Sequence, residues 1–370
     1  MARVILAEPW FGGSHRAWAE GLAIHSSHDI AVVGLEPTLW RWRLRAGAAP
    51  LADAIASEIV ERGEPDLLLV SGLVDVAALL GHLRPSPDLP VVTYMHETQL
   101  IYPTASVAPD PDVTFRNWES WLASDQVWFN SAFHRDAVVE ALPAWAASQP
   151  EPLPIDEISG SFHVVPVGVE PPAGVRLPSE GSPIILWPHR WEPDKAPEVF
   201  RRALSKLADA GLDFRLVLAG EDPAGSPDRE VIIDEHADRL LAAGPFERAE
   251  YERWLHAADL VVSCANHEFF GIAVVEALMA GCVPVLPAAL SYPELIPPEL
   301  HDAALYPVGT FGTRLADAVA NLAERRLATV DLADAMQRFA WPTVIVDYDM
   351  RITAMTCEGH AIVTSLVTGS

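Results

Sequence analysis

The chain alternates short runs of valine, isoleucine and leucine with longer stretches of helical or loop character. Runs this short and continuously apolar are typical of parallel strands buried on both faces. We predict strands at 4–7, 30–34, 67–70, 91–94, 127–130 and 162–167 in the first half. The second half is predicted to hold strands at 184–187, 214–219, 260–263 and 283–286. This alternation predicts an α/β fold with helices on both faces of each sheet.

Helices are predicted between these strands, at 14–25, 197–210, 249–257 and 272–280. Proline and glycine crowd residues 170–183, which cannot form regular structure easily and are predicted to be an interdomain linker. The chain then comprises two doubly wound, Rossmann-like domains. Ligands of open α/β sheets bind at the carboxyl ends of the strands, so we expect those ends to face a central cleft.

The composition is typical of a globular cytoplasmic enzyme. Half of the 370 residues are hydrophobic, yet no apolar run approaches the ~20 residues that cross a bilayer. The N-terminus enters a strand directly, so we expect no signal peptide and no membrane contact. Three cysteines, at 264, 282 and 357, are too few and too scattered for a disulfide framework or a zinc site.

The net charge is strongly negative and evenly spread, at −26 for the whole chain. Residues 1–175 hold 9 Lys and Arg against 22 Asp and Glu, and residues 176–370 hold 16 against 29, which makes −13 in each half. Nucleic-acid binders usually present a positive surface, because phosphate contacts supply much of their affinity. The charge therefore argues against a basic domain and favours solubility.

The sharpest chemical pattern lies at residues 267–281, HEFFGIAVVEALMAG, after a predicted strand. Phe269, Phe270 and Gly271 fall at the start of the predicted helix, where free backbone N–H groups and the helix dipole favour anionic or hydroxyl ligands. Glu276 follows beside an otherwise apolar face, and a carboxylate there needs donors such as sugar hydroxyls. The alternative is an ordinary helix cap followed by one surface glutamate.

A second pattern lies at residues 187–195, WPHRWEPDK, at the end of the first strand of the second domain. It places Arg190 and Lys195 on one loop, and Lys195 is one of only two lysines in the chain. Two cations there can converge on a diphosphate. A solvated loop with scattered charge is the alternative.

Together, the two patterns resemble the retaining glycosyltransferases of family 4, which have the two-domain GT-B fold. The shared features are Arg-x4-Lys after the first strand of the second domain and Glu-x7-Glu with an aromatic-Gly step. The resemblance implies that Arg190 and Lys195 bind the diphosphate of a nucleotide-sugar. It also implies that Glu268 lies beside the donor sugar as a catalytic residue and that Glu276 holds the ribose hydroxyls.

The resemblance extends over both domains. It implies an acceptor-side domain at 1–170, a linker at 171–183, a nucleotide-sugar-binding domain at 184–340 and a helix at 341–370 that crosses back to the first domain. Phe246 lies in a loop expected to face the base of the donor. In the GT-B fold the glycine-rich loop after the first strand faces the cleft, so Gly12 and Gly13 would let the backbone approach donor phosphates and acceptor closely.

His96 follows the predicted strand at 91–94, with Glu97 and Gln99 beside it. A lone histidine is often structural, but this one lies at the carboxyl end of a strand, where ligands bind. Many family 4 enzymes place a cleft histidine near the donor sugar. The resemblance therefore implies a catalytic role for His96.

Four segments, at 8–15, 96–103, 129–133 and 187–195, resemble one branch of that family, the tRNA-queuosine α-mannosyltransferases. These enzymes attach mannose from GDP-mannose to queuosine in the tRNA anticodon loop. Thr98 and Pro188 depart from the branch, because asparagine is expected at each position. The resemblance implies an acceptor site that includes Gly12, Ser14, His15, Glu97 and Gln99.

Residues 39–45, LWRWRLR, form a basic and aromatic island in an acidic half. Its arginines can meet phosphates while Trp40 or Trp42 stacks on a base, as in single-strand recognition. The alternative is an amphipathic element with buried tryptophans, whose arginines offset neighbouring acidic groups. With a tRNA acceptor implied, the acceptor site also receives Arg41, Trp42, Arg43 and Arg45.

We therefore predict retaining transfer of mannose from GDP-mannose to queuosine-containing tRNA, without a cofactor or a metal. No Asp-x-Asp stands beside a predicted strand to hold a metal diphosphate, and Arg190, Lys195 and helix N–H groups can neutralise it instead. The identity of the donor rests on the resemblance alone. The alternative is a family 4 enzyme with another nucleotide-sugar and a small or lipid-linked acceptor, which suits the acidic charge better than tRNA does.

Overall fold

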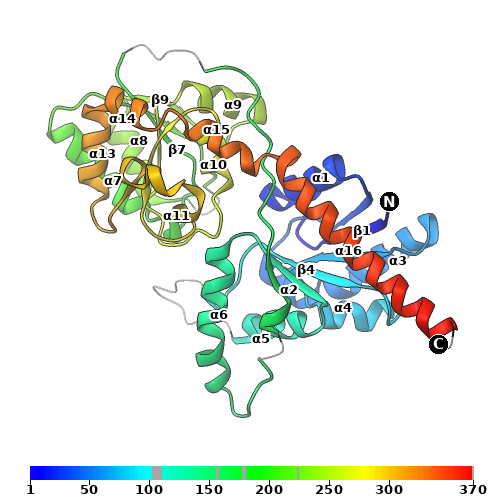
Figure 1. The fold of residues 1–370 in the computed structure, drawn as a ribbon. Coiled ribbons are helices and arrows are strands. Elements are labelled where there is room, and N and C mark those ends of the chain that lie inside the picture. The colour runs from blue at the N-terminus through cyan, green and yellow to red at the C-terminus, as the bar shows by residue number, and fades with distance from the viewer. Residues whose placement is uncertain (102–110, 156–157, 177–180, 223–224, 369–370) are drawn as a thin grey trace. The chain divides into compact units, whose positions relative to one another are not determined.

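A computed structural model of the chain describes residues 1–101, 111–155, 158–176, 181–222 and 225–368 (Figure 1). The chain forms two compact units. The first comprises Met1–Gly168 and helix α16 (Trp341–Thr368), and the second comprises Val169–Ala340. Each unit is built on one six-stranded parallel sheet, which confirms the predicted α/β class. No helix within the described ranges is long and apolar enough to span a membrane.

The sheet of the first unit has the strand order β2-β1-β3-β4-β5-β6. Its strands are β1 (Arg3–Glu8), β2 (Asp29–Gly34), β3 (Leu67–Ser71), β4 (Val91–Met95), β5 (Gln126–Phe129) and β6 (Phe162–Val164). β3 and β4 are buried at every position, as their continuous apolar runs require. All six strands predicted for this half are confirmed.

Helices connect these strands and cover the sheet. They are α1 (Gly13–His25), α2 (Trp40–Ala46), α3 (Ala48–Arg62), α4 (Val76–Leu83), α5 (Pro111–Leu122), α6 (Ala132–Ala147) and the 3-10 helix η1 (Ser159–Ser161). α3 contributes Leu51 and Ile55 to a core that also contains Ile5 and Leu68 of the sheet. Full burial of such a side chain contributes roughly 1.5–3 kcal/mol, so these contacts hold helix and sheet together.

Helix α16 joins the first unit through a buried aromatic contact. Trp341 is buried, and a Cβ added at Gly21 or Gly168 would lie 2.2 Å from its indole ring. Any larger residue at either position would therefore displace the tryptophan. Farther along the helix, the hydroxyl of Tyr348 accepts from Nε1 of Trp18 and donates to the carbonyl of Pro166, each at 3.1 Å.

The sheet of the second unit has the order β12-β11-β10-β7-β8-β9. Its strands are β7 (Ile184–Trp187), β8 (Arg215–Leu218), β9 (Leu240–Ala243), β10 (Leu260–Val262), β11 (Val283–Pro287) and β12 (Leu305–Tyr306). β9 and β12, which lie at the two edges of the sheet, are not among the strands predicted from sequence. β12 has two residues and β9 is only partly buried, so neither shows the continuous apolar run of an inner strand.

The larger helices of the second unit include all three that are predicted for this half. They are α7 (Pro197–Asp209), α8 (Pro227–Glu235), α9 (Arg248–Ala257), α10 (Ile272–Met279) and α13 (Phe311–Ala320). Shorter ones are η2 (Pro193–Lys195), α11 (Tyr292–Leu295), η3 (Pro298–Leu300), α12 (His301–Ala304), α14 (Leu322–Ala328), α15 (Leu332–Met336) and η4 (Gln337–Phe339). α7 buries Phe200, Leu204 and Leu207, which share one face at helical spacing. In the predicted linker at 171–183, residues 177–180 lie outside the described ranges and the others form no helix or strand.

Candidate active site

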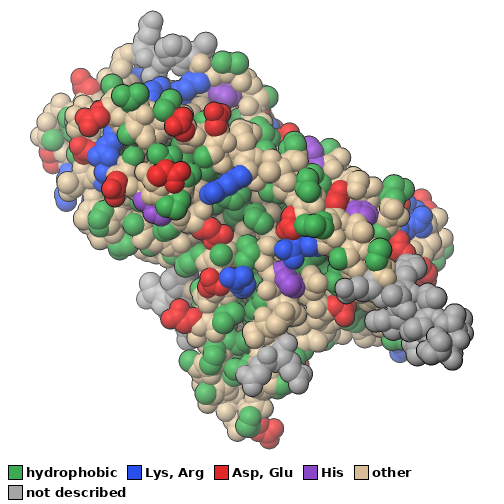
Figure 2. Space-filling view, viewed as in Figure 1, with side chains coloured by type: hydrophobic (Ala, Val, Ile, Leu, Met, Phe, Trp, Pro, Cys, Tyr) green, Lys and Arg blue, Asp and Glu red, His purple; other side chains and the backbone are tan. Residues whose placement is uncertain are grey.

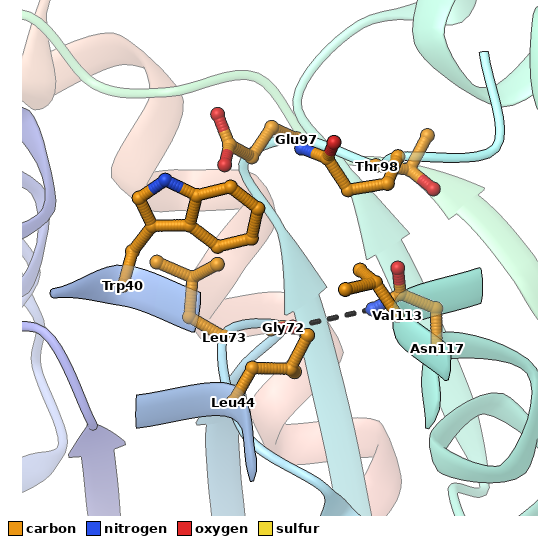
Figure 3. Close-up of a pocket in the computed structure, with 9 residues that line it drawn as sticks. Trp40, Leu44, Gly72, Leu73, Glu97, Thr98, Val113 and Asn117 are labelled. Atoms are coloured by element: carbon orange, nitrogen blue, oxygen red, sulfur yellow. Dashed lines mark hydrogen bonds between the residues drawn. The ribbon is translucent and has the colours of Figure 1, made fainter. Parts of the chain in front are cut away.

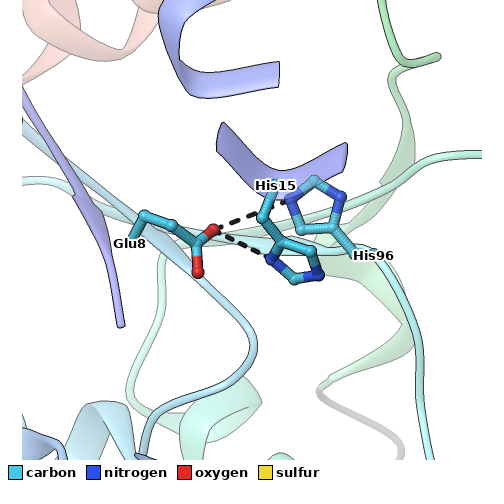
Figure 4. Close-up of side chains that lie close together, drawn as sticks. All are labelled: Glu8, His15 and His96. Carbon is cyan, nitrogen blue, oxygen red and sulfur yellow. Dashed lines mark hydrogen bonds and ion pairs between the residues drawn. The ribbon is translucent and has the colours of Figure 1, made fainter. Parts of the chain in front are cut away.

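Three segments of the first unit bring Glu8, His15 and His96 together (Figure 4). Glu8 ends β1, His96 follows β4, and His15 lies in the first turn of α1. β1 and β4 are parallel strands of one sheet, so their carboxyl ends lie on one edge, where ligands of α/β sheets bind. His15 and His96 were expected in the site from sequence, whereas Glu8 was not assigned a role.

The carboxylate of Glu8 is fully buried and contacts groups on both sides. Its Oε1 accepts the backbone N–H of Trp10 at 2.9 Å. Its Oε2 lies 3.0 Å from Nδ1 of His15 and 3.9 Å from Nε2 of His96. Burying a carboxylate is costly unless it accepts hydrogen bonds or faces a cation, so these contacts explain why a glutamate is tolerated here.

His96 is held as a neutral imidazole in an aromatic pocket. Burial lowers its pKa well below the usual value, and the neighbouring His15 lowers that pKa further. The ring meets Trp18 edge-on at 4.7 Å, and Asn130 donates to the His96 carbonyl at 2.8 Å. Nε2 is buried, makes no hydrogen bond to the described residues and lies 3.9 Å from Oε2 of Glu8.

The same three side chains form a donor set that is able to hold a divalent cation. Their ligand atoms, one carboxylate oxygen and two imidazole nitrogens, all lie within 4.8 Å of one another. At 3.0 Å, however, the contact between Glu8 and His15 is already a hydrogen bond and needs no ion. A reaction without metal therefore stays a prediction, with chelation as its test.

Glu8 carries a weak signal in the sequence that does not single it out. Glu8 directly follows the apolar run at residues 4–7, VILA, and precedes a glycine-rich loop that contains a histidine. An acidic residue at a strand end is common in exposed loops. Glu8 differs from such exposed acidic residues because it is completely buried beside two histidines from other segments.

In the second unit, Lys195 and Glu268 form a buried ion pair. Nζ of Lys195 donates to the carbonyl of His267 at 2.8 Å and lies 3.2 Å from Oε2 of Glu268. Asp194 provides a second carboxylate, 3.1 Å from Nζ. Burial lowers the pKa of Lys195, but the two carboxylates raise it above the usual value, so the ammonium stays charged. Burial raises the pKa of Glu268, and Lys195 outweighs it and keeps that pKa low.

The two cations expected to converge on a diphosphate lie in different surroundings. Lys195 is buried at the end of η2, which excludes a solvated loop as the explanation for this residue. The side chain of Arg190 is 52% exposed on the preceding loop, where its Nη2 lies 3.2 Å from Oε2 of Glu192. Lys195 is therefore the better-fixed member of the pair.

Glu276 lies on α10 and is only 7% exposed, which excludes the alternative of a surface glutamate. Arg248, at the start of α9, forms an ion pair with its carboxylate. Burial raises the pKa of Glu276, and Arg248 opposes that rise. From the sequence, a ligand was expected to supply the hydrogen-bond donors for Glu276. In the structure, Arg248 of the chain itself supplies them.

Three other donor-side residues lie as their sequence positions suggest, at the start of α10. Gly271 is the N-cap residue, and Phe269 and Phe270 precede it with buried side chains. A ligand at this helix end can therefore reach their backbone rather than their rings. Phe246 follows β9, with its ring centroid 6.3 Å from that of Trp254.

The glycine-rich loop after β1 leads into α1. Gly12 is the N-cap residue of that helix, and Gly13 begins it. A Cβ at Gly12 would lie 2.7 Å from Cβ of Pro37, and Gly13 has a φ of 49°. Packing and backbone conformation within the unit thus already require glycine at both positions. Ser14 follows, exposed on the first turn.

The basic and aromatic island forms α2, a short amphipathic helix. It buries Leu44 and leaves Trp42 61% exposed, so the alternative of buried tryptophans is wrong for Trp42. Arg43 donates through Nε and Nη2 to the carbonyl of Glu36, at 3.1 and 2.7 Å. Its guanidinium is thereby engaged within the unit.

The other two arginines of α2 differ from each other. Nε of Arg45 donates to Oδ2 of Asp112 on α5 at 2.9 Å, as expected if this arginine offsets a neighbouring acid. Arg41 is exposed, and its guanidinium lies 4.9 Å from the ring centroid of Trp40. On the face shown in Figure 2, acidic and basic side chains are interspersed rather than gathered into one broad basic patch.

Comparison with known proteins relates these residues to a family. A family model described as tRNA-queuosine alpha-mannosyltransferase N-terminal matches residues 3–169, and one described as glycosyl transferases group 1 matches residues 182–325. The chain is 33% identical over 317 residues to the tRNA-queuosine alpha-mannosyltransferase of Drosophila melanogaster. The aligned residues cover 80% of this chain and 82% of that relative.

The chain is also similar to a second mannosyltransferase and to a solved structure. A GDP-mannose-dependent alpha-mannosyltransferase of Mycobacterium tuberculosis is 34% identical over 177 residues, covering 46% of this chain and 42% of that protein. Among solved structures, sucrose-phosphate synthase of Thermosynechococcus elongatus is similar over 100% of both chains, with a TM-score of 0.69 and 16% identity. At that identity the likeness concerns the fold alone, and it confirms the predicted GT-B class.

Proposed function

This chain belongs to the family of tRNA-queuosine alpha-mannosyltransferases, and from that premise we propose that it transfers mannose from GDP-mannose to queuosine in the anticodon loop of tRNA. The observation that carries the proposal is the match of residues 3–169 to the family's own N-terminal domain. That match includes Glu8, His15 and His96. The partial likeness to a GDP-mannose-dependent alpha-mannosyltransferase supports the choice of donor.

The donor diphosphate is assigned to the second unit. Lys195 carries a charge that its two carboxylate neighbours stabilise, so it can form charge-assisted hydrogen bonds to a phosphate. The N–H groups at the start of α10 add partial positive charge there. Glu268 would contact the sugar and stabilise positive charge that develops as the glycosidic bond breaks, and Arg190 and Glu276 complete the donor site.

The reacting hydroxyl of the acceptor is assigned to the first unit. An Nδ1–H of His15 that donates to Glu8 leaves a lone pair on Nε2, which can accept a hydrogen bond from a hydroxyl. His96, kept neutral by burial, can bind a second hydroxyl of the acceptor or of the donor sugar. Glu8 touches neither substrate in this scheme and acts as a positioning residue.

Mannose transfer then needs neither a metal nor a covalent enzyme intermediate. The leaving diphosphate, neutralised by Lys195 and helix N–H groups, takes the proton of the attacking hydroxyl. The bond from the sugar to the diphosphate breaks as the bond to the queuosine oxygen forms on the same face, which retains the configuration. Since the acceptor is a modified tRNA, we expect the protein to act in the cytoplasm.

The test is to incubate the protein and GDP-mannose with queuosine-containing and queuosine-lacking tRNA, with and without EDTA, and to weigh the nucleosides by mass spectrometry. We expect one hexose on queuosine, none on the unmodified tRNA, and undiminished turnover in EDTA. Donor hydrolysis without any product on either tRNA would contradict the tRNA acceptor and favour a small-molecule acceptor. Loss of turnover in EDTA, restored by a divalent cation, would contradict metal independence.

A further inference from the structure

A shallow pocket that is partly open to solvent lies in the first unit, beside the carboxyl ends of β3 and β4 (Figure 3). Its apolar lining comes from Trp40 and Leu44 of α2, Leu73 after β3, and Val113 of α5. Glu97 and Gln99, which follow β4, supply polar groups. The pocket therefore combines one aromatic side chain with hydrogen-bonding groups, at the edge of the sheet where Glu8 and His96 also lie.

We propose that this pocket binds the guanine-like base of the acceptor nucleotide, turned out of its stack, and this inference rests on the proposed function. Proteins that act on a base or its substituent commonly extrude it, stack it on aromatic or apolar side chains and read its pairing edge by hydrogen bonds.

The stacking residue is Trp40 rather than Trp42. Trp40 is half-buried and lines the pocket, whereas Trp42 is 61% exposed and does not. Arg41 lies 4.9 Å from the ring centroid of Trp40, a cation–π distance that helps to fix the indole. A fixed aromatic ring loses little conformational entropy when a base stacks on it.

Glu97 is suited to select the base. A guanine-like pairing edge presents N1–H and an exocyclic N–H side by side, and one carboxylate can accept both. An adenine-like edge places an acceptor at N1, which a carboxylate repels. Figure 3 shows the carboxylate of Glu97 on the same side of the pocket as the indole of Trp40, so one base can meet both.

Hydrogen bonds and ion pairs hold the walls of the pocket before any ligand binds. Nδ2 of Asn117 on α5 donates to the carbonyl of Gly72 at 3.3 Å. Asp112, also on α5, accepts from Arg45 of α2 at 2.9 Å and from Arg116 at 3.3 Å. α2 and α5 are thus tied together beside the pocket, and such preorganisation lowers the entropy that binding costs.

The test compares Trp40→Ala, Trp40→Phe and Glu97→Gln with Val60→Ala, a control at an exposed apolar residue of α3 in the same unit. For each protein we would measure kcat and KM for queuosine-containing tRNA, KM for GDP-mannose and the thermal shift with GDP. We expect Trp40→Ala and Glu97→Gln each to lower kcat/KM for the tRNA by about 10-fold or more, the usual effect of losing one stacked base or one bidentate contact. Trp40→Phe keeps a ring and should stay close to the wild type.

The donor measurements separate this assignment from the proposed function. KM for GDP-mannose and the GDP shift should not change, because the donor site lies in the other unit. If the wild type mannosylates queuosine but Trp40→Ala and Glu97→Gln do so equally well, the pocket assignment is wrong and the proposed function stands. An equal loss in Val60→Ala would also overturn it. If the wild type mannosylates neither tRNA, both fail.

Discussion

Glu8 is a single residue that serves two histidines, although its carboxylate is completely buried. A carboxylate in that place selects the ring nitrogen of His15 that carries the proton, because only an N–H can donate to it. An amide is less suited to this task, since one of its two polar atoms is a donor. The charge of Glu8, more than its size, is therefore expected to matter for catalysis.

Replacing Glu8 with glutamine should lower kcat/KM for queuosine-containing tRNA by about 10-fold, because His15 is no longer fixed in the tautomer that accepts a hydrogen bond from the acceptor hydroxyl. KM for GDP-mannose should stay unchanged, because the diphosphate of the donor is proposed to bind in the second unit. Steady-state kinetics with queuosine-containing tRNA provide the measurement. Glu20→Gln is the matched control, since Glu20 forms an exposed pair with Arg16 on α1. Equal activity of Glu8→Gln and wild type would refute the positioning role.

At the scale of the element, α2 combines two kinds of arginine on seven residues. Arg45 ties the helix to Asp112 of α5, and Arg43 holds the preceding turn through the carbonyl of Glu36. Arg41 projects into solvent above Trp40. If tRNA phosphates meet this helix, Arg41 is best placed to contact them, while Arg43 and Arg45 would have to exchange partners.

Replacing all three arginines with alanine should flatten the salt dependence of tRNA binding and leave GDP affinity unchanged. We expect Arg41→Ala alone to reduce the salt slope by about one unit, as one lost phosphate contact does. Arg45→Ala should mainly lower stability, by about 0.2–1 kcal/mol, because its ion pair is partly exposed. Fluorescence binding at several salt concentrations and thermal unfolding measure the two effects. A salt slope reduced more by Arg45→Ala than by Arg41→Ala would reverse these roles.

At the scale of the whole molecule, the chain has a net charge of −26, and both proposed substrates, GDP-mannose and tRNA, are also negatively charged. On the face shown in Figure 2, basic side chains are scattered among acidic ones and form no broad basic surface. In the second unit Lys195 is buried between Asp194 and Glu268, so a phosphate that approaches it also approaches two carboxylates. In the proposed donor site, this ammonium, Arg190 and the backbone N–H groups at the start of α10 are the groups that face the diphosphate.

GDP at about 100 times its Kd should raise the free energy of unfolding by ~2.7 kcal/mol, since a ligand that binds only the folded chain stabilises it by mass action. UDP and ADP at equal concentration should raise it less. Lys195→Ala should abolish the GDP effect, whereas Lys206→Ala, which changes the other lysine on the exposed side of α7, should preserve it. Thermal-shift measurements decide this. A shift with UDP alone would contradict GDP-mannose as the donor.

Much of the fold and the family could be predicted from sequence, because the signals are local. A strand buried on both faces must be a continuous apolar run, so the inner strands of both sheets are visible in the chain itself. The edge strands β9 and β12 bury fewer residues, so this apolar signal is weaker in their sequences. The motifs around Lys195, Glu268 and His96 are likewise contiguous in sequence, and they were sufficient to indicate a glycosyltransferase.

Tertiary structure alone decided which distant residues meet. Burial converts Glu8 from an ordinary acidic residue at a strand end into the partner of His15 and His96, because β1 and β4 end at one edge of the sheet. The tertiary structure likewise brings Arg248 of α9 to Glu276 of α10. Packing of α2 against α5 turns Trp40 toward a pocket and leaves Trp42 in solvent, although the two are near neighbours in sequence. Residue type sets what a side chain is able to do, while solvent exclusion and the approach of separate segments determine whether it does so.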